Sequence, residues 1–159
     1  MCKFIGIDVS KQTFDASFLE EDKLHHAVYE NNAAGFRKLL RQVGDADLVL
    51  MEASGSYYLP LASFLFEGGK RVGVENPLSI KHYSQSKLKR AKTDKADSKT
   101  IAEYAKKNEG EIRIWQPESE ACMKIRQIFT RIQLLQKQIS QNYNQLEAFG
   151  SSGVLDTAL

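Results

Sequence analysis

The sequence has few of the residues that build cross-linked, zinc-bound or membrane-spanning proteins. It has only two cysteines, Cys2 and Cys122, which are too few for a disulfide framework. Neither cysteine is spaced from a histidine as zinc ligands are. The longest apolar stretch, 59–66, is far shorter than the roughly 20 residues that cross a bilayer. The first residues also lack the basic and apolar segments of a secretion signal. These absences predict a cytoplasmic protein without a membrane span.

The net charge of +2 conceals an uneven distribution. Between residues 81 and 99, seven basic residues stand against two acidic ones, a local net charge of +5 that leaves the remainder at −3. Such a run is usually a solvated face, yet this one leads directly into Asp94 and Asp97. A phosphate-attracting surface beside acidic residues favours nucleic acid as the partner. The predicted contacts with the sugar-phosphate backbone are Lys81, Lys87, Lys89, Arg90, Lys92, Lys95 and Lys99.

Two short apolar runs, 4–7 and 48–51, each end in a carboxylate, Asp8 and Glu52. Apolar runs of this kind suit strands buried on both faces, and such strands are usually parallel, so Asp8 and Glu52 are expected at one edge of the sheet. On a helix, Asp94 and Asp97 share a face. Four converging carboxylates would repel one another unless some were protonated or a hard divalent cation, Mg²⁺ or Mn²⁺, were bound. The pattern therefore predicts a metal site.

Each carboxylate also has a plainer interpretation. An acidic residue at the end of a strand is common, Asp94 can cap the helix that follows it, and Asp97 is favourable in the first turn of that helix. Glu75 repeats the pattern of a strand followed by a carboxylate, but Asn76 and Pro77 turn the chain directly afterwards. We expect Glu75 to be a loop residue.

The pattern of apolar residues predicts an α/β domain over residues 1–115. Three strands joined by short polar turns are expected to be antiparallel, and alternating helices and strands follow, which together describe a mixed five-stranded sheet with flanking helices. The predicted strands are 3–8, 13–18, 24–30, 47–51 and 71–74, and the predicted helices are 33–43, 58–67, 77–85 and 94–108. His25 and His26 fall within a strand, so their side chains should point to opposite faces.

A long helix is predicted from 118 to 149, within a segment, 116–150, whose only proline and glycine are Pro117 and Gly150 near its ends. Its apolar residues recur in steps of three and four, as in a coiled coil. The narrow stripe suits a partner helix, so the sequence predicts a homodimer or a higher homo-oligomer, with a frayed tail over 151–159. The predicted interface is Ile125, Ile128, Ile132, Leu135, Ile139, Asn142, Leu146 and Phe149.

Four ordered motifs together resemble the DEDD transposases, the insertion-sequence recombinases that include the pilin-gene invertases and the bridge-RNA-guided recombinases. The motifs are Ile5-Gly6-Ile7-Asp8-Val9-Ser10-Lys11, Met51-Glu52-Ala53-Ser54-Gly55-Ser56-Tyr57, Asn76-Pro77 and Ala91-Lys92-Thr93-Asp94-Lys95-Ala96-Asp97. The resemblance covers residues 1 to about 150. It implies a ribonuclease H-like fold similar to the RuvC-type Holliday-junction resolvases, followed by a coiled coil. It also implies Asp8, Glu52, Asp94 and Asp97 as catalytic metal ligands, with DNA and a guide RNA as candidate partners.

The chain departs from this family in two respects. Ser98 stands where the family usually has alanine, a mild change that should leave the metal site intact. Family members continue into a second domain with a serine nucleophile, and Ser151 and Ser152 do not lie in its glycine-rich motif. The chain is therefore expected to bind nucleic acid as the N-terminal portion of a recombinase, without completing recombination.

Three other functions are compatible with the residues. The first is a free-standing, structure-specific endonuclease that activates water at the same site. The second is a non-catalytic module for nucleic-acid binding and dimerisation, in which the carboxylates only end strands and cap a helix. The third is half of an actin-like or sugar-kinase ATPase, since Gly6 to Lys11 would suit a phosphate-binding hairpin, but the second glycine-rich phosphate loop is missing.

Overall fold

The computed structural model describes residues 2–21, 23–86 and 94–151, with the backbone alone for 94–96. The chain divides into two compact units, 1–117 and 118–159. Among the described residues, the first unit holds the sheet and four helices, and the second is one long helix.

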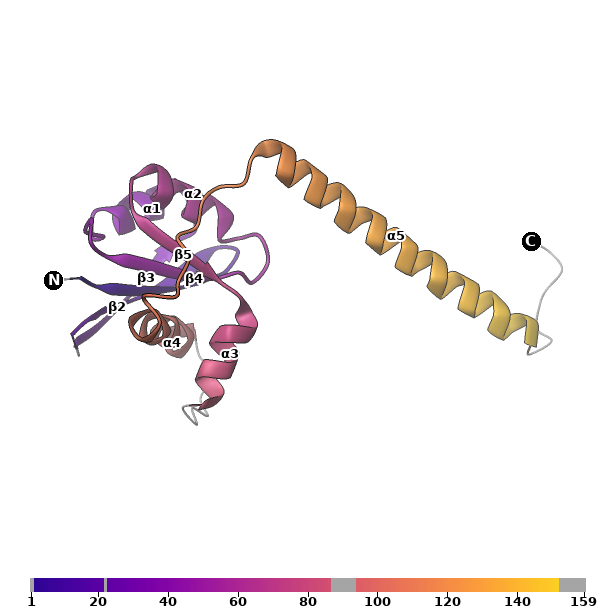
Figure 1. Cartoon of the computed structure of the whole chain (residues 1–159), viewed down its shortest axis with the longest axis horizontal. Helices are drawn as coiled ribbons and strands as arrows, with labels where there is room; N and C mark the ends of the chain where they lie inside the picture. The colour runs from indigo at the N-terminus through magenta and orange to yellow at the C-terminus, as the bar shows by residue number, and fades with distance from the viewer. Residues whose placement is uncertain (1, 22, 87–93, 152–159) are drawn as a thin grey trace. The chain divides into compact units, whose positions relative to one another are not determined.

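The first unit is built on a mixed five-stranded sheet with the order β3-β2-β1-β4-β5. Strands β1, β2 and β3 form antiparallel pairs, whereas β4 runs parallel to both β1 and β5. This arrangement confirms the predicted fold class (Figure 1). The strands are β1 Phe4–Val9, β2 Thr13–Glu20, β3 Lys23–Glu30, β4 Leu48–Glu52 and β5 Arg71–Glu75.

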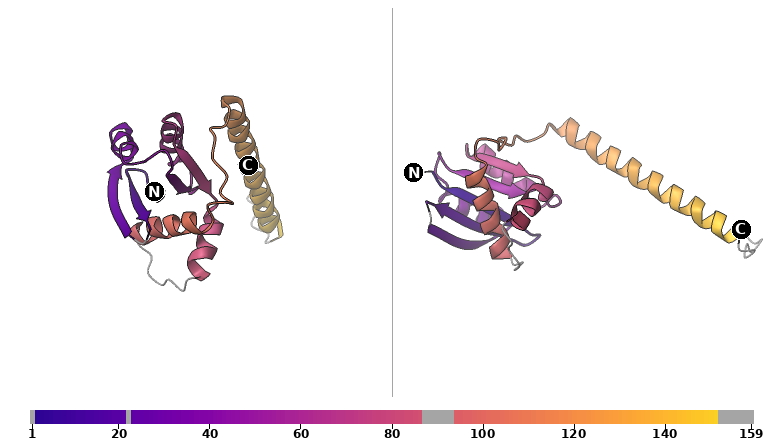
Figure 2. Two further views of the ribbon diagram at one scale, coloured as in Figure 1. Left: turned by 60° about the vertical axis from the view of Figure 1, so that its left-hand side comes forward. Right: turned by 60° about the horizontal axis from the view of Figure 1, so that its bottom comes forward.

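Helices cover both faces of the sheet, as Figure 2 shows. On one face, α1 (Ala33–Leu40) and α2 (Leu59–Glu67) close the larger apolar cluster. On the other face, α4 (Asp94–Lys107) packs across β1, β2 and β4, with α3 (Pro77–Ser86) beside it. A smaller cluster fills this side of the sheet.

Helix α1 shows how local chemistry sets an element's ends. The Asn32 side chain accepts hydrogen bonds from the backbone N–H groups of Ala34 and Gly35, at 2.9 and 3.1 Å, and so satisfies donors that have no partner inside the helix. The helix ends at Leu40, three residues before its predicted end, because the chain tightens into a turn in which the Gln42 N–H bonds to the Leu39 carbonyl. Val43 is nevertheless buried.

Helix α4 is held on the sheet by a close contact at Gly6. A Cβ atom added to Gly6 would stand closer than 3.0 Å to backbone atoms of Ser98, Ile101 and Ala102. Ser17 is paired with Gly6 on the adjacent strand, and its hydroxyl is 2.8 Å from that of Ser98, with both side chains fully buried. Because Gly6 has no side chain, α4 can pack directly against β1. The hydrogen bond between Ser17 and Ser98 fixes the position of the helix along the strand.

The second unit consists of α5, Glu120–Ser151. It begins two residues later than predicted and is exposed along its whole described length. Every apolar residue of the predicted interface is exposed, from 43% at Leu135 to 66% at Ile125. Within the residues that the structure describes, no helix is long and apolar enough to cross a membrane.

Candidate active site at the carboxyl edge of the sheet

Asp8 and Glu52 lie next to each other at the carboxyl edge of the two central strands. The last pair in the parallel ladder between β1 and β4 is Ile7 with Met51, and each carboxylate follows directly. Because side chains alternate along a strand, Asp8 shares a face with Gly6, and Glu52 shares one with Leu50. Gly6 and Leu50 both face α4. The two half-buried carboxylates therefore occupy one edge, as the sequence predicts, and the strand register also places them on one face.

Glu75 extends this acidic row, and its prediction as a loop residue is wrong. It is the last residue of β5 and is paired with Glu52 in the parallel ladder. The strand continues past Val74 because the Ala53 N–H donates to the Glu75 carbonyl at 2.9 Å. The Glu75 carboxylate itself accepts a hydrogen bond from the Asn76 N–H at 3.0 Å. The sequence signal was present, since an apolar run precedes Glu75 as it does Asp8 and Glu52.

The N-terminal end of α4 points toward the same edge. Ser98 lies over Gly6 in the middle of β1, and Lys106, near the other end of the helix, donates from its Nζ to the Glu21 carbonyl at the opposite edge. Asp94 begins the helix and Asp97 directly precedes Ser98, so both are on the side of Gly6 nearer to Asp8. Asp97 is half-buried. For Asp94 only the backbone is described.

The described side chains do not by themselves complete a metal site. No three acidic, histidine or cysteine residues with described side chains lie close enough together to hold a metal ion. The Asp94 side chain is not among those described. What the structure brings together is the pair of strand-end carboxylates and the helix start above them. All of the candidate ligands are carboxylates, the donor type that Mg²⁺ and Mn²⁺ prefer.

Asp15 and His26 form a polar pair on the same face, which the sequence pattern alone does not reveal. Asp15 is the register partner of Asp8, and its Oδ1 is 2.8 Å from Nε2 of His26. His25 instead packs its ring on Phe18, with 5.9 Å between the ring centroids. The neighbouring histidines thus point to opposite faces, as predicted. Only the strand register, which the sequence does not state, places Asp15 beside Asp8.

The structure describes part of the predicted basic surface. Lys81 on α3 and Lys99 on α4 are both exposed, and Lys99 forms an ion pair with Glu103 at 3.8 Å. For Lys95 only the backbone is described. Lys87, Lys89, Arg90 and Lys92 lie outside the described residues.

Comparisons with known proteins agree with this architecture. Residues 5–150 match the model of a transposase family, the IS110-type DEDD transposases. The chain is 30% identical over 151 residues to the pilin gene-inverting proteins of Moraxella bovis and Moraxella lacunata. Each alignment covers 91% of this chain and 46% of the relative, so the chain spans about half the length of these curated relatives.

The fold is similar to that of a solved resolvase. RuvC of T. thermophilus, solved in complex with a Holliday junction substrate, superposes with a TM-score of 0.54 over 72% of this chain and 100% of its own. At 14% identity this likeness shows a shared RuvC-like fold. The family match over almost the whole chain decides the assignment, and the protein belongs to the IS110-type DEDD transposase family.

Proposed function

We propose that this chain is the RuvC-like part of a DNA transposase or site-specific recombinase. In this proposal, Asp8, Glu52, Asp94 and Asp97 hold Mg²⁺ or Mn²⁺ at the carboxyl edge of the sheet, where DNA strands are cleaved and exchanged. The observation that carries the proposal is the parallel register of β1 and β4, which ends in Asp8 on one strand and Glu52 on the next. Family membership supports DNA as the substrate.

The four carboxylates suit this role chemically. Bound divalent ions would supply charge stabilisation for the attacking and leaving oxygens of a phosphodiester. The protein's own contribution is to fix the ligands, and it does so with a strand pair in register and with a helix held by Gly6, Ser17 and Ser98. The exposed ammonium groups of Lys81 and Lys99, with the other basic residues of 81–99, would neutralise nearby phosphates.

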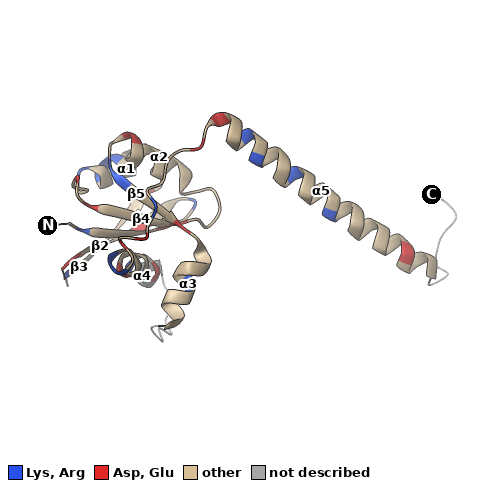
Figure 3. Ribbon diagram, in the orientation of Figure 1, with Lys and Arg blue, Asp and Glu red and all other residues tan. Residues whose placement is uncertain are grey.

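The proposed assembly is a homodimer, or a higher homo-oligomer, formed through α5. The support is the exposure of its seven apolar interface residues together with their heptad spacing. Isoleucine at Ile125, Ile132 and Ile139 occupies one heptad position, where β-branched residues favour two-stranded pairing in parallel coils. Figure 3 shows that the basic residues of α5 lie between its start and about its middle.

A metal titration of matched variants tests the site. Calorimetry with Mn²⁺ is expected to show binding to the wild type and a loss of at least tenfold in affinity in Asp8→Asn and Glu52→Gln. Two control variants make the same charge change at other positions. Glu75→Gln lies at the same edge, and Asp45→Asn alters an exposed carboxylate that pairs with the largely buried Lys70. Equal Mn²⁺ affinity in the wild type and Asp8→Asn would mean that the carboxylates do not bind metal and only end the strands. That result would favour the non-catalytic module.

A second experiment separates recombinase from free-standing nuclease. A labelled four-way DNA junction is incubated with the chain and Mn²⁺, and binding and cleavage are followed on gels. Binding without cleavage is expected if the reaction needs groups that this chain does not supply. Cleavage that Asp8→Asn abolishes would favour the endonuclease. A guide RNA added as competitor tests whether RNA uses the same surface.

The basic surface and the long helix each have their own test. Replacing Lys87, Lys89, Arg90 and Lys92 with alanine should flatten the dependence of log affinity on log salt, by about 0.9 per lost contact with duplex DNA.

Light scattering should give the mass of a dimer or a larger oligomer. Asn142→Leu should raise the stability of that assembly while loosening its register. A monomer mass at high micromolar concentration contradicts the assembly.

A further inference from the structure

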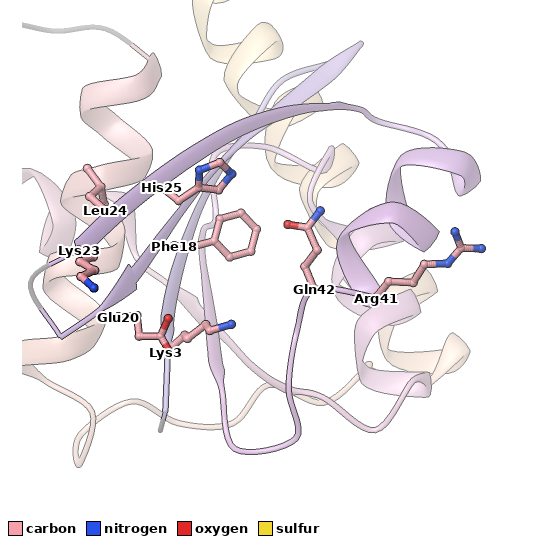
Figure 4. A pocket seen from close by; sticks show the side chains of 8 residues that line it. All are labelled: Lys3, Phe18, Glu20, Lys23, Leu24, His25, Arg41 and Gln42. Carbon is pink, nitrogen blue, oxygen red and sulfur yellow. The ribbon is translucent and has the colours of Figure 1, made fainter.

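A pocket opens at the end of the sheet opposite to the carboxylates. It has a volume of about 430 Å³, within the range of small-ligand sites. It lies between the first residues before β1, the hairpin of β2 and β3, and the turn after α1 (Figure 4). Lys3 directly precedes β1 and lies five positions before Asp8, which places Lys3 about 17 Å from the acidic row at 3.3–3.4 Å per residue.

One side of the pocket is an aromatic platform. Phe18 is buried, with only 7% of its surface exposed, and His25 is exposed above it, with the ring centroids 5.9 Å apart and the planes at 39°. The two residues are register partners on β2 and β3. Phe18 and His25 both line the pocket, so the two rings together form one of its walls. A flat ring stacked there would be sandwiched against a fixed surface.

Apart from Leu24, the remaining lining is charged and polar. Lys3 and Lys23 provide ammonium groups, Glu20 a carboxylate and Gln42 an amide. In the part of the chain that the structure describes, neither lysine forms an ion pair, whereas Lys70, Lys99 and Lys124 each have a carboxylate partner. In Figure 4, Lys3 and Gln42 extend toward the space beside the Phe18 ring, and the guanidinium of Arg41 extends outward from it. The pocket therefore combines ammonium groups, which attract phosphate, with a carboxylate and an amide, which form hydrogen bonds. All of these groups line the same pocket as the two aromatic rings.

We propose that this pocket binds one nucleotide of a single-stranded nucleic acid, with its base stacked on His25 and its phosphate at Lys3 and Lys23. Stacking on an aromatic side chain next to cations is how proteins bind single strands, whose bases are free to turn outward. A base inside a duplex is already stacked on its neighbours and cannot reach the platform. The identity of the ligand as nucleic acid rests on the proposed function, but the pocket shares no residue with the metal site.

The test compares three fluorescent octamers by anisotropy, in EDTA so that metal binding at the carboxylates contributes nothing. The probes are oligothymidylate, oligouridylate and an abasic strand with the same phosphates. At least one of the first two should bind about tenfold more tightly than the abasic strand, the value expected for one stacked base. The tighter of the two identifies the strand as DNA or RNA. Equal affinity of the wild type for all three probes overturns the proposal.

Paired variants assign the effect to the pocket. His25→Ala should lower the affinity for the normal strands to that for the abasic strand, and His25→Phe, which keeps a ring, should restore the preference. Lys23→Gln should lower the slope of log affinity against log salt by about 0.7, the value for one single-strand phosphate. Lys38→Gln, an equal charge change on the exposed side of α1, should not. An unchanged base preference in His25→Ala, or equal slopes in the two lysine variants, refutes the site, whatever the metal titration shows.

Discussion

Replacing Gly6 with alanine should push α4 slightly away from the sheet and destabilise the first unit more than the same substitution at Gly73 or Gly110. The new Cβ would meet backbone atoms of Ser98, Ile101 and Ala102 at less than 3.0 Å, and backbone cannot swing aside as a side chain can. The helix must therefore move away from β1. Overpacking of this kind typically costs about 1–3 kcal/mol.

The same displacement should break the buried hydrogen bond between Ser17 and Ser98, whose hydroxyls are 2.8 Å apart. A lost intramolecular hydrogen bond adds about 1 kcal/mol, so we expect a total near 3 kcal/mol. With a urea m-value of about 2 kcal/mol/M, the midpoint of unfolding should fall by about 1.5 M. Trp115 is the single tryptophan, and it packs edge-on against Phe66, so its fluorescence reports the first unit alone.

The other two glycines provide a graded control. A Cβ on Gly73 would come within 3.0 Å only of the side-chain ends of Ile112 and Leu50, which can shift, and a Cβ on Gly110 would meet nothing within 4 Å. The expected order of destabilisation is Gly6→Ala, then Gly73→Ala, with Gly110→Ala within about 0.5 kcal/mol of the wild type. If Gly6→Ala unfolds at the same urea concentration as Gly110→Ala, α4 does not rest on β1.

Three further perturbations have definite expected outcomes. Asn32→Ala removes the side-chain acceptor of two N–H groups and should cost about 1 kcal/mol by urea unfolding, with Asn32→Ser recovering most of it. Burial raises the pKa of Tyr29, opposed in part by Gln42, so the folded state keeps that proton longer than the unfolded chain. Stability should then decline above about pH 10, and less steeply in Tyr29→Phe, as thermal unfolding across that range would show. Ser17→Ala and Ser98→Ala should each cost about 1–3 kcal/mol, whereas the double variant should cost less than their sum, and strict additivity in a double-mutant cycle would contradict a direct hydrogen bond.

The strands could be predicted from the sequence because their residue pattern reflects burial directly. Leu48, Val49, Leu50 and Met51 are all fully buried, as an apolar run between two helical layers requires. The ends were harder to predict. β2 continues two residues beyond its predicted end, to Glu20, because it is paired with β3 up to the hairpin. Backbone pairing decides where a strand ends, and a polar residue at the end of a strand does not reveal from the sequence whether it is paired.

The edge on which Asp8 and Glu52 meet followed from the sequence, but the rest of the site's surroundings did not. Parallel neighbours necessarily end at the same side, so two strand-end carboxylates could be placed together. The face they share depends on strand register. Register also makes Glu75 a member of the acidic row and sets Asp15 beside Asp8, and it depends on contacts between residues far apart in the chain.

Ser98 illustrates how such distant contacts make a departure from the family pattern tolerable. A serine in place of the family's usual alanine puts a hydroxyl in a fully buried position, directly after Asp97 and above Gly6. An unsatisfied buried hydroxyl would destabilise the helix at the residue that follows Asp97. Ser17, 81 residues earlier, supplies the partner at 2.8 Å. We therefore expect the change to be mild, because the two hydroxyls satisfy each other, and the hydrogen bond between them ties α4 to β2, the strand beside the one that carries Asp8.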